Sequence, residues 1–99
     1  MDWLNYHHLL YFWTVAREGG IAAAARKLRL APPTVHAQIR SLEDSLGQEL
    51  LTRRGRGVAL TDAGRVVVSY ADDIFALGRE MTTAIRQEHP GDRTLRFNV

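Results

Sequence analysis

The sequence predicts a mainly helical domain of three short helices and a small β-hairpin, followed by one long helix. Three observations predict it. Apolar residues recur at helical spacing in the first half of the chain, a glycine-rich segment with arginines separates two short apolar runs, and a heptad pattern occupies the last third. The chain has 99 residues and no cysteine, so one small domain without disulfides is expected.

The first two predicted helices span residues 4–17 and 21–28. In the first, apolar side chains recur every three or four residues, and their wide stripe predicts a mostly buried helix. Gly19 and Gly20 end it, because paired glycines suit a helix stop and a tight turn. The second helix carries four consecutive alanines, which favour helix and let another helix approach closely.

The third helix is predicted from about residue 33 to residue 46. Pro32 and Pro33 mark its start, because proline is tolerated only in the first turn of a helix, and Gly47 supplies a left-handed cap. Its apolar row comprises Val35, Ile39, Leu42 and Leu46. The opposite face carries Thr34, His36, Ala37, Arg40 and Ser41.

Two short strands, residues 49–53 and 58–61, are predicted to form a hairpin. The turn between them reads Arg-Gly-Arg-Gly, which combines flexible glycines with two exposed cations. Three helices with such a hairpin make a winged helix-turn-helix over residues 4–61. Its helix-turn-helix motif lies at about 21–40 and its wing at about 49–60.

A long linker helix is predicted over residues 62–88, with Thr61 as its N-cap. Its apolar residues follow alternating steps of four and three, the heptad pattern of a coiled coil. This helix would be roughly 40 Å long, longer than the small domain is wide, so a second copy of the chain is expected to cover it in a homodimer. The dimerisation row comprises Ala63, Val67, Tyr70, Ile74, Leu77, Met81 and Ala84.

Residues 89–99 are predicted to form a hinge and the truncated first strand of an absent effector domain. Pro90 and Gly91 break the helix, and residues 94–99 begin the alternation of a strand that has no partner in the chain. The sequence is therefore expected to be a fragment of a longer protein.

The charge pattern favours an anionic partner. The net charge is +2, and residues 1–65 carry nine basic and six acidic side chains. Twelve of the thirteen basic residues are arginine, whose planar fork suits phosphates and guanine edges. Codon usage in a GC-rich genome is the alternative explanation for the arginine excess.

Other function classes find no support in the sequence. No nucleophile set, paired carboxylates, phosphate loop or metal-ligand spacing indicates an enzyme. His7 and His8 are adjacent and point to different helix faces, so no metal site is expected. No apolar run is long enough to cross a membrane and no secretion signal is found, so a cytoplasmic location is expected.

The predicted arrangement suits double-stranded DNA. The N-terminal part of the third helix fits the major groove, and the wing can lie along phosphates or in the minor groove. A dimer would place two such units in successive major grooves ~34 Å apart. The candidate DNA-binding residues are Pro32, Pro33, Thr34, His36, Ala37, Arg40, Arg53, Arg54 and Arg56.

Alternatives stay open for the roles of single residues and for the function of the chain. His36 can be a solvated surface residue, and Arg53 can pair with Glu49 or Glu43 in a purely structural role. At the level of function, the long helix can dimerise while the helix-turn-helix has lost specific DNA reading, which would make the chain a coiled-coil interaction module.

A set of residues between positions 19 and 64 forms a distinctive pattern of residue types and spacings. It comprises Gly19, Ala24, Ala25, Leu28, Pro33, Gln38, Ile39, Leu42, Glu43, Leu46, Gly47, Leu50, Leu51, Arg53, Arg56, Leu60, Thr61, Ala63 and Gly64. This spacing resembles the N-terminal DNA-binding domain of LysR-type transcriptional regulators over about residues 4–88. Shorter segments, among them Asn5-Tyr6-His7-His8-Leu9 and Gly55-Arg56-Gly57, resemble the NhaR-like subgroup of sodium/proton antiporter activators.

The chain departs from the family pattern at the start of the third helix. Ala31 stands where the family usually has a capping Ser or Thr, and prolines occupy the region of a Gln that can read adenine. Reading is therefore expected to depend on thymine methyl groups and DNA shape.

The resemblance also implies partners beyond this segment. It implies an operator with an interrupted dyad, a homodimer through the long helix, a tetramer for the full-length protein, and a place at the bacterial nucleoid. A small-molecule or ion effector would bind the absent C-terminal domain, and the segment itself would need no cofactor.

Overall fold

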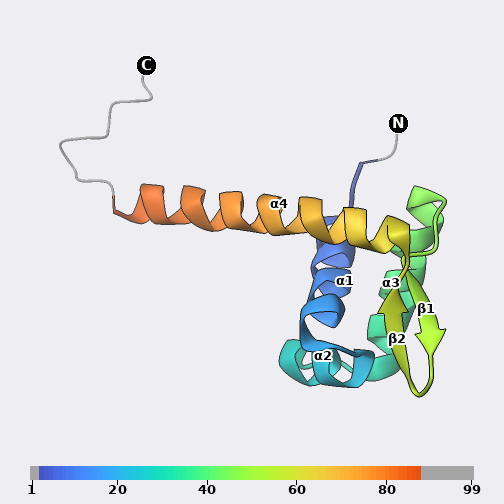
Figure 1. Ribbon diagram of the computed structural model, residues 1–99. Coiled ribbons are helices and arrows are strands. Elements are labelled where there is room, and N and C mark those ends of the chain that lie inside the picture. The colour runs from blue at the N-terminus through green and yellow to red at the C-terminus, as the bar shows by residue number, and fades with distance from the viewer. Residues whose placement is uncertain (1–2, 88–99) are drawn as a thin grey trace.

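Six elements follow one another in the order that the sequence predicts. They are α1 (Tyr6–Glu18), α2 (Ile21–Leu28), α3 (Pro32–Leu46), β1 (Leu51–Arg54), β2 (Gly57–Leu60) and α4 (Asp62–Arg86). The computed structural model describes residues 3–87. In Figure 1, α1, α2, α3 and the hairpin form a head, while α4 crosses one end of the head and projects far beyond it. The predicted fold class, a winged helix-turn-helix followed by a long helix, is confirmed.

Capping residues fix both ends of α1. The side-chain oxygen of Asn5 accepts hydrogen bonds from the backbone N–H groups of His7 (2.9 Å) and His8 (3.0 Å). The helix therefore begins at Tyr6, two residues later than predicted, because the N-cap itself lies outside the helix. At the other end Gly19 adopts a left-handed conformation with φ 87°, which glycine does without steric penalty.

Two prolines begin α3 without a side-chain cap. Ala31 precedes Pro32 and makes no capping hydrogen bond through its side chain. The backbone N–H groups of Thr34 and Val35 both donate to the Ala31 carbonyl, at 2.9 and 3.2 Å. Because the prolines have no N–H groups, the first turn leaves few donors unpaired. This explains how the helix begins without the usual capping side chain.

The hairpin is displaced toward its turn relative to the prediction. β1 and β2 pair antiparallel, with Leu51 opposite Leu60 at the outer end. Leu50 and Thr61 lie just beyond the ladder, where the N–H of Thr61 donates to the carbonyl of Leu50 at 3.0 Å. The N–H of Leu50 donates to the Glu43 carboxylate at 2.8 Å, and Thr61 caps α4. Both strands extend one residue further toward the turn than predicted.

The core lies where α1, α2, α3 and the first part of α4 meet. Its largest fully buried side chains are Phe12, Leu42, Leu50, Val15 and Val35. Ala24 and Ala25 of α2 are also buried, so the small side chains let α2 pack closely, as predicted.

Two large apolar residues do not join the core. Leu46, the last member of the predicted inner row of α3, is 41% exposed. The buried row of α3 ends at Leu42, and the last turn of the helix extends past the core. Trp3 lies before α1 and is 85% exposed.

The start of α4 is held tightly to the loop before the hairpin. The Thr61 hydroxyl accepts a hydrogen bond from the N–H of Gly64 (2.9 Å) and donates one to the carbonyl of Glu49 (2.6 Å). Gly64 is buried, and a Cβ at this position would lie 2.2 Å from the carbonyl oxygen of Leu50. Only glycine permits this close approach of two backbones.

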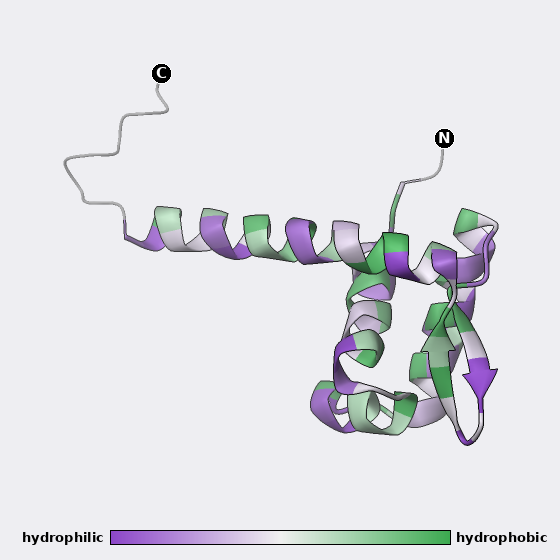
Figure 2. Cartoon of the chain, in the orientation of Figure 1, coloured by the Kyte–Doolittle hydropathy of each residue, from purple (hydrophilic) through white to green (hydrophobic). Residues whose placement is uncertain are grey.

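Along its length α4 is amphipathic. Figure 2 shows hydrophobic and hydrophilic residues alternating along the projecting helix. α4 ends at Arg86, with Gln87 as its C-cap, so the predicted helix through residue 88 ends slightly earlier. The predicted hinge and strand at 89–99 lie outside the described residues.

Candidate nucleic-acid interface

The first two turns of α3 present one outward face. Val35 and Ile39 point into the core at 0% and 2% exposure, which turns the intervening residues outward. Every residue predicted for base reading on this helix is exposed: Pro32, Pro33, Thr34, His36, Ala37 and Arg40. With helical spacing, Pro33, Ala37 and Arg40 share the middle of this face. The structure therefore brings the predicted reading residues together on one accessible helix face.

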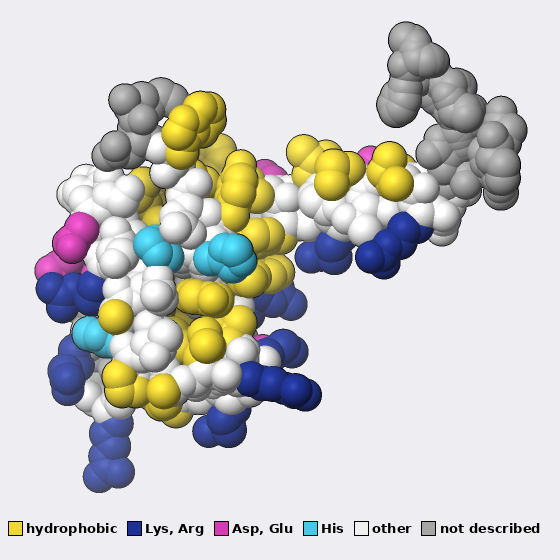
Figure 3. Space-filling view, turned by 180° about the vertical axis from the view of Figure 1, so that it is seen from behind, with side chains coloured by type: hydrophobic (Ala, Val, Ile, Leu, Met, Phe, Trp, Pro, Cys, Tyr) yellow, Lys and Arg dark blue, Asp and Glu magenta, His cyan; other side chains and the backbone are white. Residues whose placement is uncertain are grey.

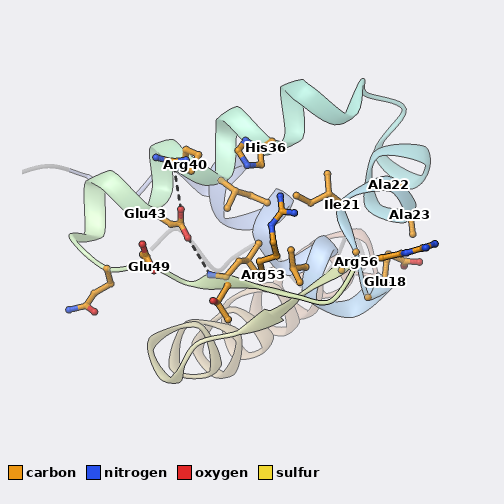
Figure 4. Close-up of a pocket in the computed structure, with 18 of the residues that line it drawn as sticks. Glu18, Ile21, Ala22, Ala23, His36, Arg40, Glu43, Glu49, Arg53 and Arg56 are labelled. Atoms are coloured by element: carbon orange, nitrogen blue, oxygen red, sulfur yellow. Dashed lines mark hydrogen bonds and ion pairs between the residues drawn. The ribbon is translucent and has the colours of Figure 1, made fainter.

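A groove of about 1030 Å³ separates α3 from the hairpin. Figure 4 shows its walls, with His36 and Arg40 on the α3 side, Arg53 and Arg56 on the hairpin side, and α2 closing one end. Arg54 does not line it. The three hairpin arginines are therefore divided between two surfaces.

Two of the four acidic residues that line the groove, Glu18 and Glu43, already have partners. The Glu43 carboxylate accepts hydrogen bonds from the N–H groups of Leu50 (2.8 Å) and Leu51 (3.2 Å) and lies 3.7 Å from the Arg40 guanidinium. Its side chain is only 12% exposed. Glu43 therefore fixes the entry to the hairpin, a role that the sequence analysis missed although the family-like Leu-Glu pair marked the residue.

The hairpin arginines have no such partners. Within residues 3–87, Arg53, Arg54 and Arg56 make no ion pair and no side-chain hydrogen bond. The structural alternative for Arg53, pairing with Glu49 or Glu43, is not seen. All three are exposed, so their guanidinium groups are available to an external anion.

The start of α2 also faces this groove. Ile21, Ala22 and Ala23 line it, and Gly20 before them makes no side-chain cap. The backbone N–H groups of a helix's first turn have no partner within the helix. They add positive partial charge to a groove wall that already carries arginines.

The predicted dimerisation row is divided between two environments. Ala63, Val67 and Ile74 are half-buried against the chain's own core, a contact that was not predicted for them, and their part in a dimer stays a prediction. The predicted row lies at the edge of the α4 face that packs on the head, so some of its members contact the core of the head. The other members of the row, Tyr70, Leu77, Met81 and Ala84, are exposed.

Sequence analysis also missed two members of the exposed apolar stripe. Val66 is 55% and Ile85 is 62% exposed, and each lies four residues from a predicted member of the row. Figure 3 shows hydrophobic side chains along the upper side of α4 and at its junction with the head. Lys and Arg side chains lie on the lower side of α4 and around the opposite end of the head.

The described residues offer few other sites. No three potential metal-ligating side chains come together within residues 3–87. In the same part of the chain no helix combines the length and apolarity that crossing a membrane requires.

Comparison with known proteins places the chain among bacterial regulators. Residues 6–65 match the model of a family described as bacterial regulatory helix-turn-helix protein, lysR family. The chain is 46% identical over 81 residues to the transcriptional activator protein NhaR of Escherichia coli (strain K12). The aligned region covers 82% of this chain. The chain is also 38% identical over 89 residues to the HTH-type transcriptional regulator TfdS of Cupriavidus pinatubonensis, which covers 90% of this chain and 30% of TfdS. The predicted resemblance to the NhaR-like subgroup is confirmed at this level.

Two solved complexes have the same fold. The DNA-binding domain of BenM in complex with catB site 1 DNA superposes with a TM-score of 0.78 at 34% identity, covering 83% of this chain and 88% of that one. The DNA complex of the CbnR DNA-binding domain gives 0.75 at 36% identity, covering 83% and 94%. The chain spans 27% of the length of NhaR, so it corresponds to about a quarter of that relative.

Proposed function

The chain belongs to the lysR family of bacterial regulatory helix-turn-helix proteins, and on this premise we propose that it binds double-stranded DNA sequence-specifically as the DNA-binding part of a transcription regulator. One observation carries the proposal. An exposed helix face lies beside a groove whose hairpin arginines have no partner within the described residues.

In this proposal α3 enters the major groove with its N-terminal half. Pro33 and Ala37 present apolar surface suited to the methyl group of thymine, while Arg40 can reach a guanine edge or a phosphate. Arg40 lies near Glu43, but its side chain remains 64% exposed, so it is accessible to a base. His36 lies at the groove side of this face.

The groove between α3 and the hairpin would receive one phosphate strand. Arg53 and Arg56 face it from the hairpin, and the first turn of α2 faces it with backbone N–H groups. Arg54, on the other surface of β1, is placed to follow a phosphate or the minor groove at the flank. These contacts position the head, and α3 reads the sequence.

We further propose that two copies associate through the exposed part of α4 and bind an operator with an interrupted dyad. The apolar stripe beyond the head supports this, since an exposed apolar row on a long helix favours a second helix. The resulting dimer would act at the bacterial nucleoid in the cytoplasm. Effector binding and a tetramer, which the resemblance implies for the whole regulator, stay predictions.

Salt dependence of binding to duplex DNA tests the proposal. We expect the logarithm of the binding constant to fall linearly with the logarithm of salt concentration, at about 0.9 for each phosphate neutralised. Arg56→Ala should weaken binding to every sequence and reduce the slope by about one.

Arg79→Ala is the matched control, because it removes the same charge from α4, away from the groove. It should leave the slope unchanged. A flat salt titration of the unaltered chain would instead favour the alternative in which the chain is a coiled-coil interaction module without DNA reading.

A further inference from the structure

The head packs against the first half of α4, where Ala71 is buried and Val67 and Ile74 contact the core, and it fixes the helix by close or polar contacts at two points. The first is the start of the helix, where Gly64 lies against the backbone of Leu50 and Thr61 bonds to the carbonyl of Glu49. The apolar contacts along this half are non-directional, so they define the direction of α4 less closely than a hydrogen bond does. A directional contact further along α4 therefore defines that direction.

Trp13 and Asp72 make that second contact. The indole Nε1–H of Trp13 on α1 donates to the Asp72 carboxylate on α4 at 2.7 Å. The Trp13 ring also packs on Phe75 with ring centroids 4.8 Å apart, and the Arg17 guanidinium lies 5.0 Å above the same ring. Within residues 3–87 this is the only hydrogen bond between side chains of α1 and α4.

The position of this hydrogen bond suits a role in setting the angle between α4 and the head, more than a role in stabilising the fold. Asp72 is exposed, so water can satisfy its carboxylate when the bond opens, and the core does not depend on it. The two anchors at Gly64 and Asp72 are about 12 Å apart along the helix, and the helix continues about 20 Å beyond the second. A tilt of about 10° at the first anchor would move the end of α4 by about 6 Å.

We propose that Trp13 and Asp72 form a latch that fixes the angle between the head and α4 and thereby selects the spacing between the two half-sites of the operator. The inference rests on the proposed function, in which two heads are joined through α4. In such a dimer the direction of each α4 determines how far apart the two α3 helices lie. A displacement of about 6 Å corresponds to roughly two base pairs along B-DNA.

The latch residues are positioning residues, since none of them lies at the groove or on the outer face of α3. Arg17 and Phe75 both pack on the indole, and the Asp72 carboxylate accepts its N–H. Trp13→Phe therefore removes the hydrogen bond and keeps an aromatic ring on Phe75. Asp72→Ala removes the same bond from the other side.

The test uses duplexes that carry two half-sites at increasing separations, and one duplex with a single half-site. We expect the unaltered chain to prefer one separation at least tenfold over separations two base pairs away. Trp13→Phe and Asp72→Ala should each reduce that preference below threefold, and affinity for the single half-site should stay within twofold. The double variant should show no further loss, because both changes remove one bond.

Two controls separate a latch from packing. Asp73→Ala removes a neighbouring carboxylate that makes no side-chain hydrogen bond or ion pair within the described residues, and it should keep the full preference. Asp72→Asn retains an oxygen that can accept from the indole, and it should restore most of the preference. Unchanged preference in both Trp13→Phe and Asp72→Ala would overturn the proposal.

A second measurement needs no DNA and so separates the latch from the proposed function. The chain has no cysteine, so Lys27→Cys and Arg79→Cys introduce two unique sites for spin labels on α2 and on projecting α4. Labelled chains diluted with unlabelled chains should give a narrow distance distribution, which Asp72→Ala should broaden or shift by several ångströms. If the unaltered chain bound no duplex, the proposed function would fail, and an unchanged distribution in Asp72→Ala would overturn the latch.

Discussion

The two halves of α4 carry the same apolar pattern and lie in different environments. In the proximal half Ala71 is fully buried and Phe75 packs on Trp13 of the head. In the distal half Leu77, Met81 and Ile85 are each more than 60% exposed. A heptad pattern therefore shows that a helix needs apolar partners but does not show which partners they are. Here the head supplies them for the first half only.

The difference follows from the length of α4. A helix of 25 residues is about 37 Å long, and α1 and the hairpin reach only its first turns. Covering a Leu, Ile or Met side chain fully is worth about 1.5–3 kcal/mol. The apolar side chains of the distal half can therefore still be buried by association, whereas those of the proximal half are already buried by folding.

A charge placed in the proximal half should have the largest effect. Ala71→Asp puts a carboxylate at a position with 0% exposure and no cationic partner in the core. We expect the free energy of unfolding to fall by about 3–5 kcal/mol, enough to unfold a small domain. Circular dichroism during thermal and urea unfolding measures it, and an unfolding curve like that of the unaltered chain would contradict the packing of α4 on the head.

The same charge in the distal half should act on association instead. Leu77→Asp lies where the side chain is 65% exposed, so the head should melt within a few degrees of the unaltered chain. The dissociation constant of the dimer should rise at least 100-fold, because the charge must be buried between two helices. Sedimentation equilibrium measures it, and an intact dimer would refute the proposed interface.

Ile74→Asp sharpens this comparison, because Ile74 lies between the two halves. From the sequence alone it is a member of the dimerisation row, and its replacement should split the dimer. In the structure it is half-buried against the core, so the change should lower both the unfolding free energy and the association. Sedimentation and thermal unfolding on the same sample distinguish these effects, and loss of association alone would show that Ile74 belongs to the distal face.

The smallest expected effect concerns the junction at the start of α4. Thr61→Ala removes the cap that accepts from the N–H of Gly64 and the hydroxyl that donates to Glu49. Loss of an N-cap costs about 1 kcal/mol, so the melting temperature should fall by about 4–8 °C. Thr61→Ser keeps the hydroxyl and should recover most of that loss. Equal loss in both variants would show that the methyl group, not the cap, matters.

Local signals in the sequence were sufficient for most of the fold. Gly19, Gly47 and the two prolines at the start of α3 set helix ends within two residues of those observed. The candidate reading residues are exposed for the same local reason, since Val35 and Ile39 bury the other face of α3.

What the sequence could not show were partners distant along the chain. Trp13 and Asp72 are 59 residues apart, and nothing near either residue indicates the other. Leu46 and Val67 are both members of apolar rows in the sequence. Leu46 is exposed and Val67 packs against the core, because the core extends to one position and not to the other. The ion pair of Arg40 with Glu43 could have been predicted from the sequence, because the two residues are three positions apart on a helix.

Selection of bound sites from a random DNA pool tests the central claim most directly, with the unaltered chain and Leu77→Asp side by side. We expect the unaltered chain to enrich inverted repeats at one fixed spacing, and Leu77→Asp to enrich single half-sites of the same sequence. No enrichment by the unaltered chain, or identical inverted repeats from Leu77→Asp, would contradict it.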